Sequence, residues 1–222
     1  MNSHLLLDPA IPPSQYLRVD LSVTNDALGD ALKDPESCQA YLDGILEKHK
    51  KRVAYGGYLE RRGLYDGFGH FNPEESGKRE YHLGVDFWAP SGTSVHTPWK
   101  GRAHSWANRT TRGDYGPVIL LEHLVHGKPL YSLYGHLSAG SLDGLFEGKE
   151  FEMGQEVGRL GSASENGGYA PHLHFQFVRD LGGCRGDYPG VCALEQLAFY
   201  RENCPDPLDY LTFSQSSVAS RP

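Results

Sequence analysis

The chain has 222 residues, of which 39% are hydrophobic and 22% charged, and it carries a formal net charge of −7 at neutral pH. This length suits one well-buried core with extensions better than two equal domains. The negative charge disfavours a nucleic-acid partner, and no apolar run approaches the ~20 residues that a membrane span needs.

The first thirteen residues do not have the pattern of a secretory signal peptide. They contain no basic segment, and Asp8 and Pro9 interrupt their apolar stretch. This favours a cytoplasmic protein.

Residues 34–52 predict the first helix. Asp34 is placed to cap it, and Pro35 suits its first turn. The apolar residues then recur with the spacing of one buried stripe: Cys38, Tyr41, Leu42, Ile45 and Leu46. The basic run at residues 48–52 fits the end of this helix, where the helix dipole favours cations.

From residue 53 to about residue 177 the pattern changes to short runs of strand type separated by Gly and Pro. Examples are residues 94–97, 118–122, 130–134 and 172–178. Residues 193–203 predict a second short helix, which ends before two prolines. We therefore expect a mainly β fold with short flanking helices, divided into an N-terminal extension (1–54), a catalytic β domain (55–180) and a C-terminal extension (181–222) packed on the same domain.

The four cysteines are Cys38, Cys184, Cys192 and Cys204, and none of them form a CxxC pair. Free or structural thiols are therefore expected rather than a second metal site, with a bridge between Cys184 and Cys192 as the alternative.

Histidines and one aspartate form the most informative pattern. His172 and His174 flank Leu173 in a predicted strand, so both imidazoles lie on one face of it. Upstream, His82 and Asp86 stand four residues apart. Two histidines and one carboxylate make a three-ligand site that leaves the fourth tetrahedral position to water, as in catalytic zinc centres.

His136, in the sequence YGHL, ends another predicted strand. Taken alone, each of these patterns also occurs in strands that bind no metal. Their combination, in this order and among strands bounded by Gly and Pro, favours a metal site.

The region from residue 82 to residue 178 resembles the M23 (LytM/lysostaphin-type) metallopeptidase domain. The resemblance is carried by HLGVDFWAPSGTSVHTPWKGR, GDYGPVILLEH, LYSLYGHLS and FEGKEFEMGQEVGRLGSASENGGYAPHLHFQF. It implies an antiparallel β-sheet of the M23 type and one Zn²⁺ per chain, bound by His82, Asp86 and His174. It also implies that His136 and His172 are catalytic histidines next to the metal.

Two details depart from the usual family pattern. Gly168-Tyr169-Ala170-Pro171 replaces the frequent STGP, and Gln176 stands where Glu is common. Neither change removes a predicted ligand or a predicted catalytic histidine, but both affect the expected shape of the active-site cleft. His70, His96, His104, His123 and His126 match no ligand position.

Three segments outside this region, GGYLERRGLY, GDYPGVC and CPDP, resemble the flanks of M23-like modules fused to class III aminotransferases. This second resemblance points away from the cell wall.

The predicted activity is hydrolysis of a peptide (amide) bond by a zinc-activated water. The chain has no HExxH motif, so the proton must be handled by another group, for which His136 and His172 are available. Their division of roles, the oligomeric state and the choice between a peptide and a small amide substrate stay open.

Three alternatives remain. One is a non-haem iron centre with two histidines and a carboxylate. Another is an M23-like module that binds without catalysis. The third is a cytoplasmic zinc amidohydrolase acting on a small amino-acid derivative. We expect the specificity of an active enzyme to depend on residues 60–80 and 104–115, which are predicted to be long loops narrowing the cleft.

Overall fold

An eight-stranded sheet forms the centre of the computed structural model, which describes residues 5–32, 34–63 and 78–211. Its order is β1 (Tyr16–Arg18), β2 (Val53–Gly56), β4 (Val85–Trp88), β11 (His172–Val178), β8 (Lys128–Gly135), β7 (Gly116–Val125), β6 (Gly101–Arg109) and β9 (Glu150–Phe151). The β1–β2 pair is parallel, and the other neighbours in this sheet are antiparallel. The fold is therefore mainly β and antiparallel, as predicted.

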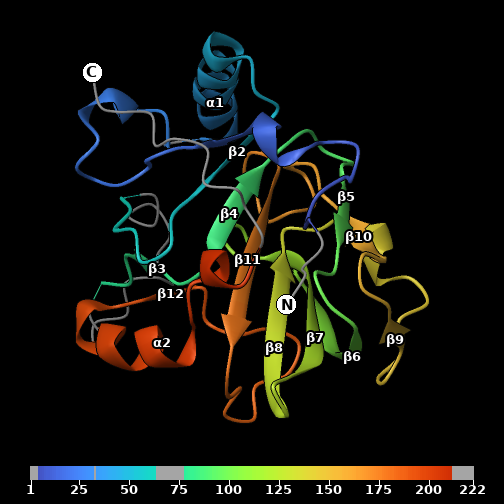
Figure 1. The fold of residues 1–222 in the computed structure, drawn as a ribbon. Helices are drawn as coiled ribbons and strands as arrows, with labels where there is room; N and C mark the ends of the chain where they lie inside the picture. Colours follow the sequence, from blue (N-terminus) through green and yellow to red (C-terminus); the bar gives the residue numbers. More distant parts are fainter. Residues whose placement is uncertain (1–4, 33, 64–77, 212–222) are drawn as a thin grey trace.

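Two small sheets stand beside the main one. β3 (Tyr81–His82) pairs with β12 (Val191–Cys192), and β5 (Ser94–His96) pairs with β10 (Glu156–Arg159). In Figure 1, β3 and β12 lie to the left of the main sheet, and β5 and β10 lie to its right. The first of these pairs matters for function because it holds His82.

The alternation of side chains along β11 separates the core from the opposite face. Leu173, Phe175 and Phe177 belong to the largest hydrophobic cluster, together with Val85 and Phe87 of β4. The residues between them, including His172 and His174, therefore lie on the other face. This confirms the prediction that the two histidines share one face of a strand.

Helix α1 (Pro35–His49) begins where the sequence predicts it. The Asp34 carboxylate accepts a hydrogen bond of 2.8 Å from the backbone N–H of Ser37, which caps the first turn. The helix ends earlier than residue 52, because Lys50 adopts a left-handed φ of 54° and the chain turns into β2. The second predicted helix is present as a 3-10 turn (Leu194–Gln196) followed by α2 (Leu197–Asn203). Figure 1 shows α1 at the upper end of the sheet and α2 at its lower left.

Both extensions pack on the main sheet. Leu6, Leu7 and Ile11 belong to the main core cluster, and β1 and β2 extend the sheet itself. Tyr188 and Cys204 belong to a further cluster, which covers the opposite face at β7 and β8. The predicted boundaries at residues 54 and 180 stay a prediction, but the segments on either side of each share hydrophobic clusters with the main sheet.

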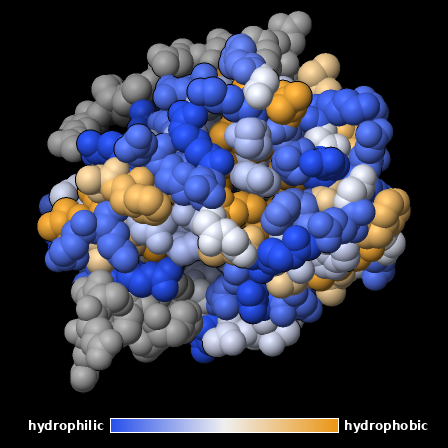
Figure 2. Space-filling model, turned by 90° about the horizontal axis from the view of Figure 1, so that it is seen from below, coloured by the Kyte–Doolittle hydropathy of each residue, from blue (hydrophilic) through white to orange (hydrophobic). Residues whose placement is uncertain are grey.

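The four cysteines are all free, so the bridge between Cys184 and Cys192 is absent from this structure. None of the described helices has the length and hydrophobicity needed to cross a membrane. The face seen from below in Figure 2 is largely hydrophilic, with small, scattered hydrophobic patches.

Candidate metal centre and active site

Strand pairing brings the predicted metal ligands together. Asp86 on β4 stands directly opposite His174 on β11 in the antiparallel register. His82 lies on β3, just before β4. Gly84 between them leaves room for the His174 ring, because a Cβ on Gly84 would lie 2.9 Å from it. The same Cβ would lie 2.6 Å from the backbone carbonyl oxygen of Phe175, so glycine at this position lets both β11 and the His174 ring approach closely.

Three atoms of these residues face a common point. His82 Nε2 lies 2.8 Å from His174 Nδ1 and 3.2 Å from Asp86 Oδ1, and His174 Nδ1 lies 3.1 Å from the same oxygen. In a tetrahedral zinc site with bonds of about 2.0–2.1 Å, two donor atoms stand about 3.3–3.4 Å apart. The triangle is thus close to the size of one face of such a site. All three side chains are buried.

The other nitrogen of each imidazole fixes its tautomer. His82 Nδ1 lies 2.8 Å from the carbonyl oxygen of Gly57, and His174 Nε2 lies 3.0 Å from Oε1 of Gln176. A carbonyl oxygen only accepts hydrogen bonds, so each of these nitrogens carries the proton. His82 Nε2 and His174 Nδ1 then present lone pairs to each other and to the carboxylate of Asp86. Such an arrangement is repulsive unless a cation or an added proton lies between the three atoms.

An added proton on His82 is disfavoured. Burial, and next the charge of Arg62, lower the pKa of His82 to about 4, despite the nearby carboxylate of Asp86. The three converging lone pairs form a donor set that fits a metal cation. Nitrogen and oxygen donors of this kind suit zinc.

A buried arginine holds the second oxygen of the aspartate. Arg62 is 2% exposed, and its NH1 group donates to Asp86 Oδ2 at 2.5 Å, while its Nε donates to Glu60 Oε2 at 2.6 Å. Glu60 Oε1 in turn accepts from the backbone N–H of Leu21 at 3.0 Å. Burial alone raises the pKa of Asp86, but its electrostatic interactions with His82 and with the Arg62 guanidinium outweigh burial and hold that pKa well below its usual value. Asp86 is thus ionised, with Oδ1 left for the metal.

The two predicted catalytic histidines stand beside the ligands. The ring centres of His136 and His172 are 4.2 Å apart, and His172 Nε2 lies 4.0 Å from Asp86 Oδ1. The Nδ1 atoms of the two rings donate to the carbonyl oxygens of Asn166 and Ala170, at 2.7 Å and 2.8 Å. Each Nε2 therefore carries a lone pair when the ring is neutral, and burial lowers the pKa of both rings.

The backbone of His136 is unusual. Its φ of 64° lies in the left-handed region, which non-glycine residues seldom adopt. Hydrogen bonds hold it there, because its N–H donates to Tyr115 and its carbonyl accepts from Gly161. The ring is thereby fixed against the metal site.

Aromatic side chains complete the walls. Tyr115 lies with its ring centre 5.3 Å from that of His174, and its hydroxyl donates to the carbonyl of Tyr188 at 3.0 Å. Trp88 stacks on His172 at 5.6 Å. Water is thus partly excluded around the donor atoms, which strengthens electrostatic interactions there.

Two hollows open from this centre. The larger, about 820 Å³, is bordered by Asp86 and His172, and the smaller, about 250 Å³, by His82, His136 and His174. The region 104–115, predicted as a long loop, is only partly one, because β6 continues to residue 109. The remaining loop lines both hollows, at Arg112 on the larger one and at residues 113–115 on the smaller. Residues 60–63 include Arg62, whereas residues 64–77 lie outside the described part of the chain.

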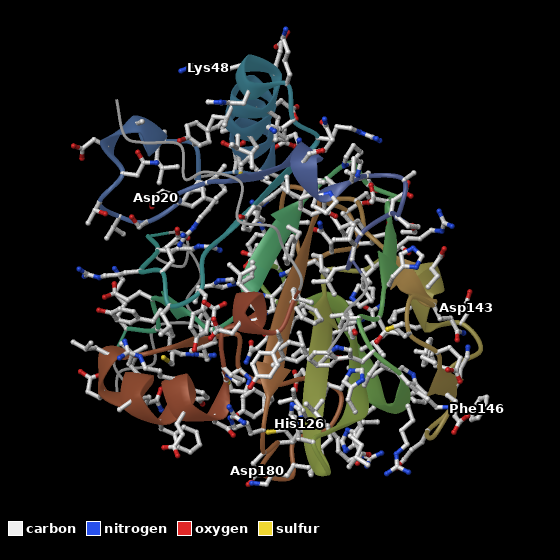
Figure 3. The ribbon with its side chains drawn as sticks, viewed as in Figure 1. Asp20, Lys48, His126, Asp143, Phe146 and Asp180 are labelled. Carbon is white, nitrogen blue, oxygen red and sulfur yellow. The ribbon has the colours of Figure 1, made fainter. Side chains whose placement is uncertain are left out.

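Among the described residues, the other histidines lie elsewhere; His4 and His70 are outside the described part of the chain. His96 bonds to the backbone of Gly154, and His104 bonds to Ser105. His123 is buried between the carbonyl of Lys100 and the hydroxyl of Ser132. His126 lies in the turn between β7 and β8, near the lower end of the molecule in Figure 3.

Sequence reasoning missed Arg62 and the acceptor Gly57. The signal was weak, because the sequence Glu60-Arg61-Arg62 has the charge of an exposed turn and only the fold places its last residue inside. Gln176 was noticed as a departure, and its contact with His174 explains it as the residue that orients that ligand.

The comparisons with known proteins agree with the resemblance found in the sequence. The model of peptidase family M23 matches residues 80–184, a stretch that contains all five predicted site residues. No curated protein has a sequence that matches this chain significantly.

Several solved structures are similar to it. A zinc-containing peptidase from Vibrio cholerae is 26% identical over 48% of this chain and 31% of its own, with a TM-score of 0.36. Lysostaphin from Staphylococcus simulans is 24% identical over 64% of this chain and 49% of its own, with a TM-score of 0.41. The chain thus spans about a third and about half of these proteins, respectively.

Proposed function

Because the model of peptidase family M23 matches residues 80–184, we propose that this protein is a zinc-dependent hydrolase that cleaves an amide bond. One observation supports this most directly. Three buried atoms that carry free lone pairs, one each from His82, Asp86 and His174, converge on a common point. Beside them stand two histidines that each keep a lone pair on Nε2. The first group suits a metal ion, and the second suits proton transfer.

Zinc bound by His82, Asp86 and His174 would polarise the scissile carbonyl and lower the pKa of a bound water to about 7. The chain's own residues handle the protons. Nε2 of His136 or His172 accepts a proton from the attacking water, and the same pair returns a proton to the leaving amine. Their Nδ1 hydrogen bonds to backbone carbonyls keep both Nε2 atoms in place through this exchange.

A matched pair of substitutions tests the assignment. His174→Ala should strip zinc or weaken its binding severely, because only two ligands remain. His172→Ala should keep nearly one zinc per chain and a folded protein, but lose about 10²–10⁴-fold in hydrolytic rate. His136→Ala should behave like His172→Ala, and the double variant should lose less than the combined factors if the two act as a unit. Zinc content is measured by elemental analysis.

His49→Ala is the control, because this exposed histidine lies at the end of α1. It should change neither zinc content nor rate. If His172→Ala loses zinc and His174→Ala keeps it, the roles are inverted. If neither changes the metal content, the zinc site is wrong. Iron in place of zinc, in protein purified without added metal, would favour the oxygenase alternative.

The activity itself is tested by incubating zinc-loaded protein with muropeptides, oligoglycine and simple N-acyl amino acids, and following released amines by mass. Cleavage of only the last group would favour a small-molecule amidohydrolase, and zinc binding without any cleavage would favour a binding module. A cytoplasmic location and a link to aminotransferase fusions stay predictions.

A further inference from the structure

The larger hollow is built mainly by residues outside the catalytic motifs. It lies between N-terminal residues 21–32 and 34–38 on one side and residues 168–172 on the other, and we call it the extension pocket. Its apolar lining includes Leu21, Val23, Leu28 and Trp88. Val23 is 46% exposed, which leaves its side chain available for contact with a ligand.

The pocket is continuous with the reacting centre, since Asp86 and His172 form part of its wall. A group held in it therefore lies next to a predicted metal ligand and a predicted catalytic histidine. The pocket is also large enough, at about 820 Å³, for a residue with a bulky side chain.

Most charged side chains of the pocket are already paired. Arg62 is held by Glu60 and Asp86, and the carboxylate of Asp34 accepts hydrogen bonds from the backbone and hydroxyl of Ser37. Arg112 differs, because it forms no ion pair with any carboxylate of the described residues. It lies against Gly168, beside the segment that leads into β11.

A single unpaired guanidinium at an apolar pocket is suited to a ligand with an apolar body and one carboxylate. Asp26, which likewise forms no ion pair with the described residues, lies in a 3-10 turn (Asp26–Leu28) of the N-terminal segment. The protein as a whole carries a charge of −7, which repels anions. A carboxylate ligand in this pocket therefore needs a local positive charge, which Arg112 supplies.

We infer that the extension pocket binds an apolar amino-acid residue with a free carboxylate, on the amine side of the scissile amide, with Arg112 pairing with that carboxylate. This inference rests on the proposed hydrolase function and names its substrate class. Water adds to the carbonyl carbon, the C–N bond breaks, and the leaving nitrogen takes a proton. The products are an acyl carboxylate and a free apolar amino acid.

Binding is tested without hydrolysis. Zinc-loaded protein is titrated with 4-methylpentanoate, 4-methylpentanamide and acetate. The first should bind about tenfold more tightly than either of the others, because only it has both the carboxylate and the apolar body. Arg112→Gln should remove the preference for acid over amide. Arg102→Gln is the matched control, because this arginine is 62% exposed and pairs with Glu122. It should keep the preference.

A preference that survives in Arg112→Gln would mean that the carboxylate is held elsewhere, by the metal for example, and would overturn the inference. Equal binding of acetate and 4-methylpentanoate would overturn the apolar part.

Hydrolysis separates this inference from the proposed function. With N-acetyl-glycyl-leucine and its C-terminal amide, the wild type should prefer the acid. Arg112→Gln should raise KM for the acid about tenfold and leave the amide unchanged. Zinc-dependent cleavage with no such preference would refute the pocket's role alone. The expected binding pattern without cleavage of any substrate would refute the hydrolase function and leave the pocket's ligand class intact.

Discussion

Replacing Arg62 by leucine should destabilise the zinc-free protein strongly. The substitution removes the partner of two carboxylates, Asp86 Oδ2 and Glu60 Oε2, whose side chains are only 3% and 11% exposed. Breaking a buried ion pair by removing one partner costs about 3–5 kcal/mol, since the remaining charge stays desolvated. Domains are stable by only about 5–15 kcal/mol, so a large share of the stability would be lost.

The neighbouring arginine provides a matched control. Arg61 also donates to a carboxylate at 2.6 Å, that of Glu80, but its side chain is 53% exposed. Ion pairs with an exposed partner contribute about 0–1 kcal/mol, and Lys78 remains as a second partner of Glu80, which is 10% exposed, so Arg61→Leu should be nearly silent. The two variants have the same change in charge and composition. Urea denaturation of both, with EDTA present, measures the difference in unfolding free energy.

Zinc provides a second measurement. A ligand that binds only the folded state at a hundred times its Kd stabilises by about 2.7 kcal/mol. Added zinc should therefore recover much of the loss in Arg62→Leu, provided the three ligands still converge. Equal losses in the two arginine variants would refute the reasoning. So would an Arg62→Leu protein as stable as the wild type, because the carboxylates would then not depend on Arg62.

Three further predictions concern the neighbours of the metal ligands. Gly84→Ala should lower the zinc content measured by elemental analysis, because the added Cβ would press on His174. Gly44→Ala is the control, because a Cβ on this residue of α1 meets only open space; it should stabilise the protein by about 1 kcal/mol in urea denaturation. Gln176→Leu should weaken zinc about 10–100-fold in competition with a chelating dye, and Gln176→Glu should retain it, since only the latter keeps an acceptor. Tyr115→Phe should keep zinc but lower the hydrolytic rate, because the smaller hollow loses its link to the C-terminal segment; an unchanged rate would show that this link is dispensable.

The local parts of the fold follow from the sequence. The alternation in residues 172–178 predicts a strand with both histidines on one face, and the strand in the structure has these bounds. The first helix is predicted by its cap and its apolar stripe, and only its end was misjudged, at Lys50. These features depend on neighbours along the chain, which is why periodicity finds them.

Contacts between distant segments could not be predicted in this way. Arg62 meets Asp86 only because β2 pairs with β4 and carries the following turn alongside it. The left-handed backbone of His136 likewise depends on hydrogen bonds from two other loops. No periodic pattern in the sequence encodes such contacts, because each requires the strand order of the finished sheet.

The metal centre depends on residues beyond the stretch that matches the family. The tautomer of His82 is set by the carbonyl of Gly57, and Asp86 is oriented by Arg62, both of which precede residue 80. Arg62 is in turn held by Glu60, which accepts from the backbone of Leu21 in the N-terminal segment. That same segment forms one wall of the extension pocket. A ligand in the pocket therefore contacts a segment that is linked by three consecutive hydrogen bonds to a predicted zinc ligand. The extension thus acts on both the electrostatics of the metal centre and the shape of the site in front of it.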